Sequence, residues 1–423
     1  MRLAAEIARA NPALGAFMAL CIERARAEAY EAERRYASGG DAPALRGVPF
    51  AAKDLFDTAG VVTAYGSAMF AQHVPDKDAA AVAAVRRAGA ILVGKTQTHE
   101  FAWGLTSINP TMGSTRNPWS LDHISGGSSG GSAVAVAAGL VPIALGTDTA
   151  GSIRLPSALC GVVGLKPTYG RVSLEGVFPL AWSLDHAGPI ARTPADAALV
   201  LAQISRHAPL AFRDQPERAI AGLRVGVPPD GDDAAVRDAG DALARAGAKL
   251  VPMRVPSEAA RALLPRVQGP EALLHHTRAG VYPGRSSEYG DDVRRRLEHA
   301  SALDPKDYVA AQEERERLRL AMCGLLDEVD VLLGRGAPPA PRVADLPALG
   351  DAFRQDVLAL TTPASLCGLP ACVVRMVFDA QQLPRAVQVT GAWGDEGTVV
   401  AVAEQLFTAA PEVQERTPEI PTG

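Results

Sequence analysis

Cysteine is scarce in this sequence of 423 residues, which has five thiols and no closely spaced pair. Disulfide frameworks and zinc ribbons are built from closely spaced cysteines, so neither is indicated. The most apolar uncharged stretch, 132–145, is interrupted by Gly139 and Pro142. It is shorter than the roughly 18 residues that a membrane-spanning helix needs. The first residues lack the apolar core of a secretory signal, so we expect a reducing, cytoplasmic setting without a membrane anchor.

Positive charge is not in excess either. The 42 basic and 47 acidic side chains give a formal net charge of −5, which disfavours a broad nucleic-acid surface. We therefore expect no nucleic-acid partner. Lysine is the rarer base, and it occurs only at positions 53, 77, 95, 166, 249 and 306. A lysine inside an apolar segment is conspicuous in this chain.

Apolar residues make up 48% of the chain, which is enough for a large core and excludes a mainly disordered protein. Short apolar runs alternate with helix-like segments, and this alternation predicts an α/β fold around a largely buried sheet. The capping box Thr193-Pro194-Ala195-Asp196 marks one helix start. We expect helices over 1–37, 78–88, 132–138, 194–204 and 305–326, and strands over 47–53, 91–93, 141–145, 223–227, 329–333, 372–378 and 386–389.

A polar, proline-containing segment covers residues 206–221. Its composition is that of a linker between domains. The strands on its two sides would equally fit in one sheet, and the sequence leaves both arrangements open.

Residues 125–132 read Ser-Gly-Gly-Ser-Ser-Gly-Gly-Ser and lead directly into an apolar helical segment. A flexible linker has this composition but normally joins polar flanks. Glycines around paired hydroxyls indicate a backbone in conformations that side chains would forbid, with several N–H groups exposed. The segment is therefore a candidate functional loop, with a flexible linker as the alternative.

A second segment of small residues, 146–151, leads to Ser152. Small residues let the backbone turn sharply and present consecutive N–H groups beside the serine hydroxyl, as an oxyanion hole requires. The alternative is an ordinary strand-to-helix turn in which Ser152 is the N-cap. The residues around Ser152 do not form the Gly-x-Ser-x-Gly elbow of α/β-hydrolases, which disfavours that fold.

Lys53 ends the apolar run 47–52. A lysine in such a place commonly extends its amine to the surface. A desolvated lysine instead has a lowered pKa and acts as a general base near neutral pH. Together with the two serine-containing segments, Lys53 is consistent with a Ser-Lys nucleophile system.

The three segments occur in the order of the amidase signature family, with Ser128 and Ser152 at the family's separation, and the chain resembles that family. Further matching stretches lie at 94–102, 115–119, 164–168 and 183–189. The resemblance is dense over 47–200 and extends to about residue 407. It implies one three-layer α/β/α domain over 1–423 with a central mixed sheet of about ten strands. Its parts would be an N-terminal helical segment (1–46), a catalytic core (47–200), and the remaining sheet with substrate-pocket helices (201–423).

The resemblance also implies the chemistry, which is hydrolysis of a small linear amide through an acyl-enzyme. Ser152 would be the acylated nucleophile, Ser128 a proton relay that follows a cis peptide bond, and Lys53 the general base. No cofactor or metal is implied, and a homodimer is left open. Most relatives have glycine at position 150. The oxyanion hole would consist of the backbone N–H groups of Thr149, Ala150, Gly151 and Ser152.

A second function shares the same signature, the A subunit of a glutamyl-tRNA amidotransferase, which releases ammonia within a complex. The chain departs from common family patterns outside the catalytic core. It has Gly-Arg-Gly at 334–336 where many relatives have Thr-Pro-Thr, and Cys367 where threonine is common. These departures and the short chain favour a stand-alone amidase.

Two other motifs have competing interpretations. Residues 89–96 fit the Gly-x-x-x-x-Gly-Lys-Thr pattern of a P-loop NTPase around Lys95. The four intervening residues are apolar, however, and the helical segment precedes them instead of following, so we expect a strand. His275 and His276 are adjacent in a helix-like segment and would face different directions, so we expect a pocket-lining or packed role and no metal site.

Overall fold

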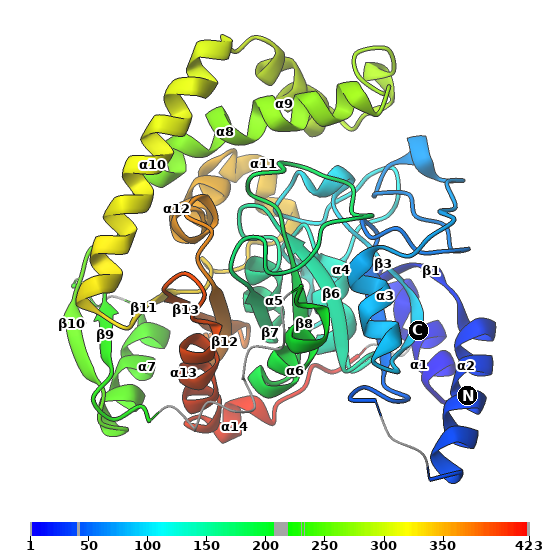
Figure 1. Cartoon of the computed structure of the whole chain (residues 1–423), viewed down its shortest axis with the longest axis horizontal. Helices are drawn as coiled ribbons and strands as arrows, with labels where there is room; N and C mark the ends of the chain where they lie inside the picture. The colour runs from blue at the N-terminus through cyan, green and yellow to red at the C-terminus, as the bar shows by residue number, and fades with distance from the viewer. Residues whose placement is uncertain (1, 40–42, 207–218, 230, 232, 421–423) are drawn as a thin grey trace.

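The computed structural model describes residues 2–39, 43–206, 219–229, 231 and 233–420. A mixed sheet of 11 strands runs through its centre, in agreement with the expected sheet of about ten (Figure 1). Its strands are β1 (Phe17–Leu20), β2 (Pro49–Lys53), β3 (Ile91–Thr96), β6 (Ile143–Asp148), β7 (Val163–Lys166), β8 (His186–Ala191), β9 (Arg224–Val227), β10 (Lys249–Pro252), β11 (Val331–Arg335), β12 (Ala371–Phe378) and β13 (Pro384–Gly391). Their order across the sheet is β1-β3-β2-β6-β8-β7-β12-β13-β11-β9-β10. Separately, β4 (Arg116–Asn117) pairs with β5 (Ser120–Ile124).

Helices cover both faces of the sheet, which gives three layers. Alternating strand residues separate the faces: Val331 and Leu333 pack on one side, and Leu332 packs on the other. One face is covered by α3 (Ala80–Arg87), α6 (Pro194–Ile204), α7 (Ala234–Arg245) and α13 (Glu396–Thr408). The other is covered by α1 (Arg2–Leu14), α4 (Gly130–Ala137), α5 (Arg154–Cys160), α8 (Ser257–Arg278), α10 (Pro305–Glu328) and α12 (Ala352–Leu366). The remaining α-helices are α2 (Ile22–Ala37), α9 (Asp291–Ser301), α11 (Leu346–Leu349) and α14 (Pro411–Gln414).

The prediction of one helix over residues 1–37 is wrong. Gly15, at φ +59°, follows α1, and β1 then pairs antiparallel with β3 before α2 begins. The Asn11 side chain fixes this break, because its Nδ2 donates to the Phe17 carbonyl at 2.9 Å and its Oδ1 accepts the Phe17 N–H at 2.7 Å. The composition of the segment favours helix, but the tertiary pairing with β3 overrides it.

Residues 207–218 of the expected linker lie outside the described residues. On either side of that segment, however, the strands belong to the same sheet, since β7, which precedes it, pairs with β12, and β12 is joined through β13 and β11 to β9. The one-sheet arrangement is therefore confirmed. Among the residues that the structure describes, no helix has the length and apolar character needed to cross a bilayer.

Three neighbouring parallel strands position the candidate site. Strand β2 lies between β3 and β6 and is parallel to both, so all three carboxyl ends meet at one edge. This edge is where open α/β sheets bind ligands. Helices α8, α9 and α10 lie together along one side of the molecule, and α12 packs against α8 near the strands (Figure 1).

Candidate active site

Lys53 is the last residue of β2 and is completely buried. Its Nζ donates to Ser128 Oγ at 2.7 Å and to Thr147 Oγ1 at 2.7 Å. Burial lowers the pKa of Lys53 to about 7, although the negative charges of Asp148 and Asp185 oppose that shift. Lys53 therefore changes its charge near neutral pH, and the structure brings it into contact with Ser128 as the sequence predicts.

Asp54 follows Lys53 but points to the other side of the strand. It accepts the Ala64 N–H at 3.0 Å, and its other oxygen lies 3.5 Å from Lys95 Nζ. Asp54 therefore balances Lys95 instead of the lysine beside it in sequence.

The P-loop hypothesis is wrong. Lys95 lies inside β3 and is fully buried, and its amine donates to the Phe56 carbonyl and to Thr63 Oγ1 at 2.5 and 2.7 Å. A phosphate cradle needs its lysine in a loop between a strand and a helix. This lysine is instead a packed cation within the sheet.

The Gly/Ser-rich segment is a buried turn that continues into the first residues of α4, so the flexible-linker alternative is wrong. Residues 125–132 are all buried, and the Gly127–Ser128 peptide bond is cis, as expected from the family resemblance. The Ser128 carbonyl accepts hydrogen bonds from the His99 N–H and the Ser107 hydroxyl, each at 3.3 Å. A side chain at Gly130 would begin 2.4 Å from Ser107 Oγ, which explains why this position needs glycine.

Ser129 joins this loop to the Ser152 segment. Its N–H donates to the Ser152 carbonyl at 3.2 Å, and its hydroxyl donates to the Thr147 carbonyl at 3.1 Å. Ser152 is 4% exposed and precedes α5, whose N-cap is Ile153. The interpretation of Ser152 as an ordinary N-cap is therefore wrong.

Gly151 has φ +118°, a region that favours glycine, and a Cβ there would lie within 3 Å of the Thr361 side chain. Its N–H, which the resemblance placed in the oxyanion hole, donates to Asp148 Oδ1 at 2.7 Å. Within the described part of the chain, the N–H groups of Thr149, Ala150 and Ser152 have no hydrogen-bond acceptor. These three are available to a ligand in the structure as it stands.

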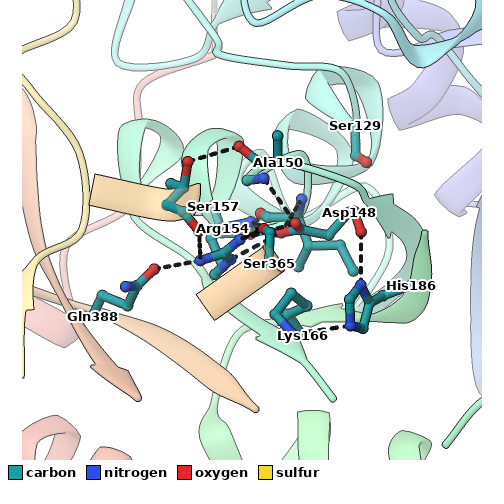
Figure 2. A network of polar contacts seen from close by, with 12 residues as sticks. Ser129, Asp148, Ala150, Arg154, Ser157, Lys166, His186, Ser365 and Gln388 are labelled. Carbon is teal, nitrogen blue, oxygen red and sulfur yellow. Dashed lines mark hydrogen bonds and ion pairs between the residues drawn. The ribbon is translucent and has the colours of Figure 1, made fainter. Parts of the chain in front are cut away.

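Asp148 and Arg154 form a buried ion pair beneath the Ser152 turn (Figure 2). Arg154 Nε and Nη2 each lie 3.0 Å from a different Asp148 oxygen, and Asp148 Oδ2 also accepts the Ile153 N–H at 3.1 Å. Burial alone would raise the pKa of Asp148, but the guanidinium holds that pKa below its usual range. Arg154 also donates to Gln388 Oε1 at 2.9 Å and to Ser365 Oγ at 2.7 Å. The pair fixes the turn and links it to distant parts of the chain.

The structural role of Asp148 and Arg154 was not predicted from the sequence. The available signal was two opposite charges enclosing a run of small and apolar residues. Thr147, the second acceptor for Lys53, was also missed, although it lies near the end of a strand parallel to β2.

Asp185, in the matching stretch 183–189, supports the turn from the other side. Its Oδ1 accepts the Thr149 hydroxyl at 2.6 Å, and its Oδ2 accepts the Leu180 and Ala181 N–H groups, each at 2.9 Å. Burial raises the pKa of Asp185 to about 7. This carboxyl fixes the side chain that starts the Ser152 turn.

The packing role expected for His276 is confirmed. His276 is fully buried, its Nδ1 is 2.9 Å from the Tyr289 hydroxyl, and its ring packs edge-on against Phe101. Burial lowers the pKa of His276 to about 4. Over the described ranges, no group of three or more His, Cys, Asp or Glu side chains is arranged to hold a metal ion.

A small pocket opens beside Ser152. Its walls are mostly apolar and come from the loop around 102–105, the Ser152 turn, α8 and α12. Besides Thr149 and Ser152 of the turn, two polar side chains from distant helices, Gln268 and Arg354, line it. The sequence did not reveal either residue, because α8 and α12 lie far from the catalytic segments along the chain.

The chain is similar to known proteins over nearly its whole length. The model of the Amidase family matches residues 2–400. Among curated proteins, the A subunit of the glutamyl-tRNA(Gln) amidotransferase of Roseiflexus sp. (strain RS-1) is 38% identical, with 99% of this chain and 94% of that protein covered. The corresponding protein of Chromohalobacter salexigens is 39% identical, with 95% and 91% covered.

Solved structures give the same result. The A subunit of the Thermotoga maritima glutamyl-tRNA(Gln) amidotransferase superposes with a TM-score of 0.82 at 30% identity, and 99% and 94% of the two chains are covered. A protein from a vestigial complex, described in connection with the origins of an s-triazine catabolic enzyme, superposes with a TM-score of 0.87 at 32% identity, covering 99% and 95%. Peptide amidase from Stenotrophomonas maltophilia reaches 0.82 at 29% identity, covering 99% and 94%. On these grounds, the chain belongs to the amidase family.

Proposed function

We propose that this protein hydrolyses a carboxamide through an acyl-enzyme on Ser152. The observation that carries the proposal is the buried hydrogen bond of 2.7 Å between Lys53 Nζ and Ser128 Oγ, at a lysine whose pKa lies near 7. A neutral amine in that position accepts a proton from Ser128, which in turn accepts the proton of Ser152. The relay makes an otherwise weak hydroxyl nucleophilic.

In the proposed reaction, Ser152 Oγ attacks the amide carbonyl carbon while its proton passes through Ser128 to Lys53. The negative charge on the carbonyl oxygen is stabilised by the free N–H groups at the turn, those of Thr149, Ala150 and Ser152. Collapse of this intermediate breaks the C–N bond, and the leaving nitrogen takes the proton from Lys53 through the relay. Water then attacks the acyl group by the same proton route, giving a carboxylic acid and free Ser152.

A second candidate function is the same chemistry carried out by a subunit of an amidotransferase complex. The curated relatives named above are amidotransferase A subunits, and these names favour such a role over the stand-alone enzyme expected from the sequence. They also conflict with the expectation that nucleic acid plays no part, because they refer to a tRNA. The purified chain distinguishes the two settings, since a stand-alone amidase releases ammonia from its substrate without any partner.

Labelling with a serine-directed phosphonate tests the assignment of the nucleophile. The wild type should gain one phosphonyl group on Ser152, and Ser152→Ala should gain none, because alanine has no nucleophile. Intact mass followed by peptide mapping measures the label. Ser157→Ala is the matched control, since it removes a buried hydroxyl of α5 that we give no catalytic role, and it should label normally. A label found on Ser128 would contradict the assignment.

We also propose a cytoplasmic location. All five cysteines are free thiols, which is the usual state in a reducing compartment.

A further inference from the structure

The pocket beside Ser152 has an unusual distribution of charge. Arg354 is the only ionisable side chain among its lining residues, and none of them carries a carboxylate. The other lining residues are uncharged, and the polar side chains among them are those of Thr149, Ser152 and Gln268. The pocket therefore presents one positive charge in a mainly apolar enclosure.

The charge of Arg354 is poorly balanced by the protein itself. Its side chain is 22% exposed, and within the described residues its one ion pair is with Asp351, at 3.8 Å. The Asp351 side chain is 64% exposed, so water screens the pair. No hydrogen bond from the guanidinium of Arg354 occurs in the described parts of the chain, which leaves its N–H donors available.

A second arginine, Arg296, lies near Arg354. Burial and the positive charge of Arg296 lower the pKa of Arg354 to about 10, although the negative charges of Asp351 and Asp292 oppose that shift, so the side chain is still charged at neutral pH. Arg296 is itself committed, because it donates to the Trp103 carbonyl and pairs with Asp292 at 3.2 Å. Arg354 is thus the guanidinium that remains to bind a ligand.

Gln268 supplies a second polar group on the same wall. Its Oε1 accepts the indole N–H of Trp103 at 3.2 Å, which orients the amide. Among the described residues no acceptor is found for the amide NH₂ of Gln268, which makes it a further donor. An anion with two acceptor oxygens matches a planar guanidinium particularly well.

We propose that Arg354 determines specificity by binding a carboxylate of the substrate, and that the substrate is an amide carrying one carboxylate and no ammonium group. The proposal rests on the proposed acyl-enzyme chemistry at Ser152. The amide carbonyl lies at Ser152, and the carboxylate at the other end of a short aliphatic chain pairs with Arg354. An α-amino acid amide such as glutamine fits less well, because its ammonium would enter a pocket without an acid.

Two substrate comparisons with the wild-type chain test the proposal. Succinamate and succinamide differ only in a carboxylate against an amide, and glutaramate and glutamine differ only in the α-ammonium group. We expect kcat/KM for succinamate to exceed that for succinamide about 10- to 100-fold, because a hydrogen-bonded charge pair usually changes binding by that factor. We also expect glutaramate to exceed glutamine.

Variants then identify the responsible residue. Arg354→Gln should reduce the succinamate-to-succinamide ratio about 10- to 100-fold, mainly through KM, and Arg354→Lys should restore part of it because the charge is kept. Arg295→Gln removes an exposed charge from α9 outside the pocket and should keep the wild-type ratio.

The outcomes separate this proposal from the chemistry on which it rests. Equal turnover of succinamate and succinamide by the wild type, or a ratio unchanged in Arg354→Gln, overturns the proposal and leaves the acyl-enzyme intact. A preference for glutamine over glutaramate overturns it as well and supports the amidotransferase setting. If the chain hydrolyses no amide and Ser152 takes no phosphonate, both the proposal and the proposed function are wrong. If Arg354→Gln is insoluble, the wild-type comparisons and Arg354→Lys decide the result.

Discussion

Three of the six lysines are buried, and their partners differ in a way that separates function from packing. Lys95 has a carboxylate, Asp54, at 3.5 Å. Lys166 donates to the Pro167 carbonyl at 3.0 Å and lies 3.2 Å from His186 Nε2. Lys53 instead donates to two hydroxyl oxygens, and one of them belongs to the predicted relay. A general base must accept a proton and later give it back, and a hydroxyl in contact with the amine allows both transfers.

Acylation should depend on one ionisation with a pKa near 7, because burial lowers the pKa of Lys53 to about that value. Below this pH the amine is protonated and cannot accept a proton, so the rate should rise with pH and level off above it. Lys53→Arg stays charged at every accessible pH and should lose about 10²–10⁴-fold in rate. Phosphonylation or acylation rates against pH measure this effect.

Lys77→Arg is the control for the lysine prediction, since Lys77 is exposed and should give the wild-type profile. If Lys53→Arg keeps near-normal rates with the same pH dependence, then Lys53 is a structural cation and the base lies elsewhere.

At the scale of elements, the turn between β6 and α5 depends on Asp148. This one carboxylate accepts the backbone N–H groups of Gly151 and Ile153 and pairs with Arg154, all in a fully buried environment. Such a pair is costly to break, because removing one charge leaves the other buried without compensation.

Asp148→Asn should therefore destabilise the protein by about 3–5 kcal/mol and abolish most acylation. The pKa of Asp148 is depressed in the folded state, so its contribution to stability is fully present above the unfolded pKa of about 3.9 and is lost progressively as pH falls from there through the lower folded pKa. Urea unfolding of both proteins at several pH values measures this, and the difference should shrink in acid. A difference that stays constant down to pH 3 would mean that the charge of Asp148 contributes nothing.

The sequence was most informative where local signals and tertiary structure agree. The helix 194–204 occurs as predicted, and Thr193 Oγ1 accepts the Asp196 N–H at 3.1 Å. The helix predicted over 1–37 failed because β1 pairs with a strand about 75 residues further along the chain, and no local pattern reports such a contact. The pocket beside Ser152 was missed for the same reason, since Gln268 and Arg354 line it only after α8 and α12 have folded over the sheet.

For the whole molecule, we propose that residues 1–423 form one domain that unfolds cooperatively. The middle of the sheet is continuous, because β7 pairs with β12 with Lys166 opposite Ala371. Arg154 also reaches across from the catalytic core to the Thr361 carbonyl and to Gln388, at 3.0 and 2.9 Å. The parts of the chain before and after residues 207–218 therefore each cover a sheet edge that the other part would leave exposed.

Thermal unfolding should consequently show a single transition, with the calorimetric enthalpy equal to the van't Hoff enthalpy. Differential scanning calorimetry measures both enthalpies. The catalytic variant Ser152→Ala, which removes one hydroxyl, should leave the number of transitions unchanged. Two separable transitions would show that the parts before and after residues 207–218 fold independently.

The scarcity of lysine has a practical consequence for labelling the folded protein. Lys53, Lys95 and Lys166 are inaccessible, whereas Lys77, Lys249 and Lys306 are exposed. Amine-reactive reagents therefore find three lysine targets on the native chain and six on the unfolded one. All three native targets lie outside the Ser152 pocket, so cross-linkers, dyes and surface immobilisation through lysine leave the active site unmodified. The number of modified lysines per chain therefore also measures unfolding.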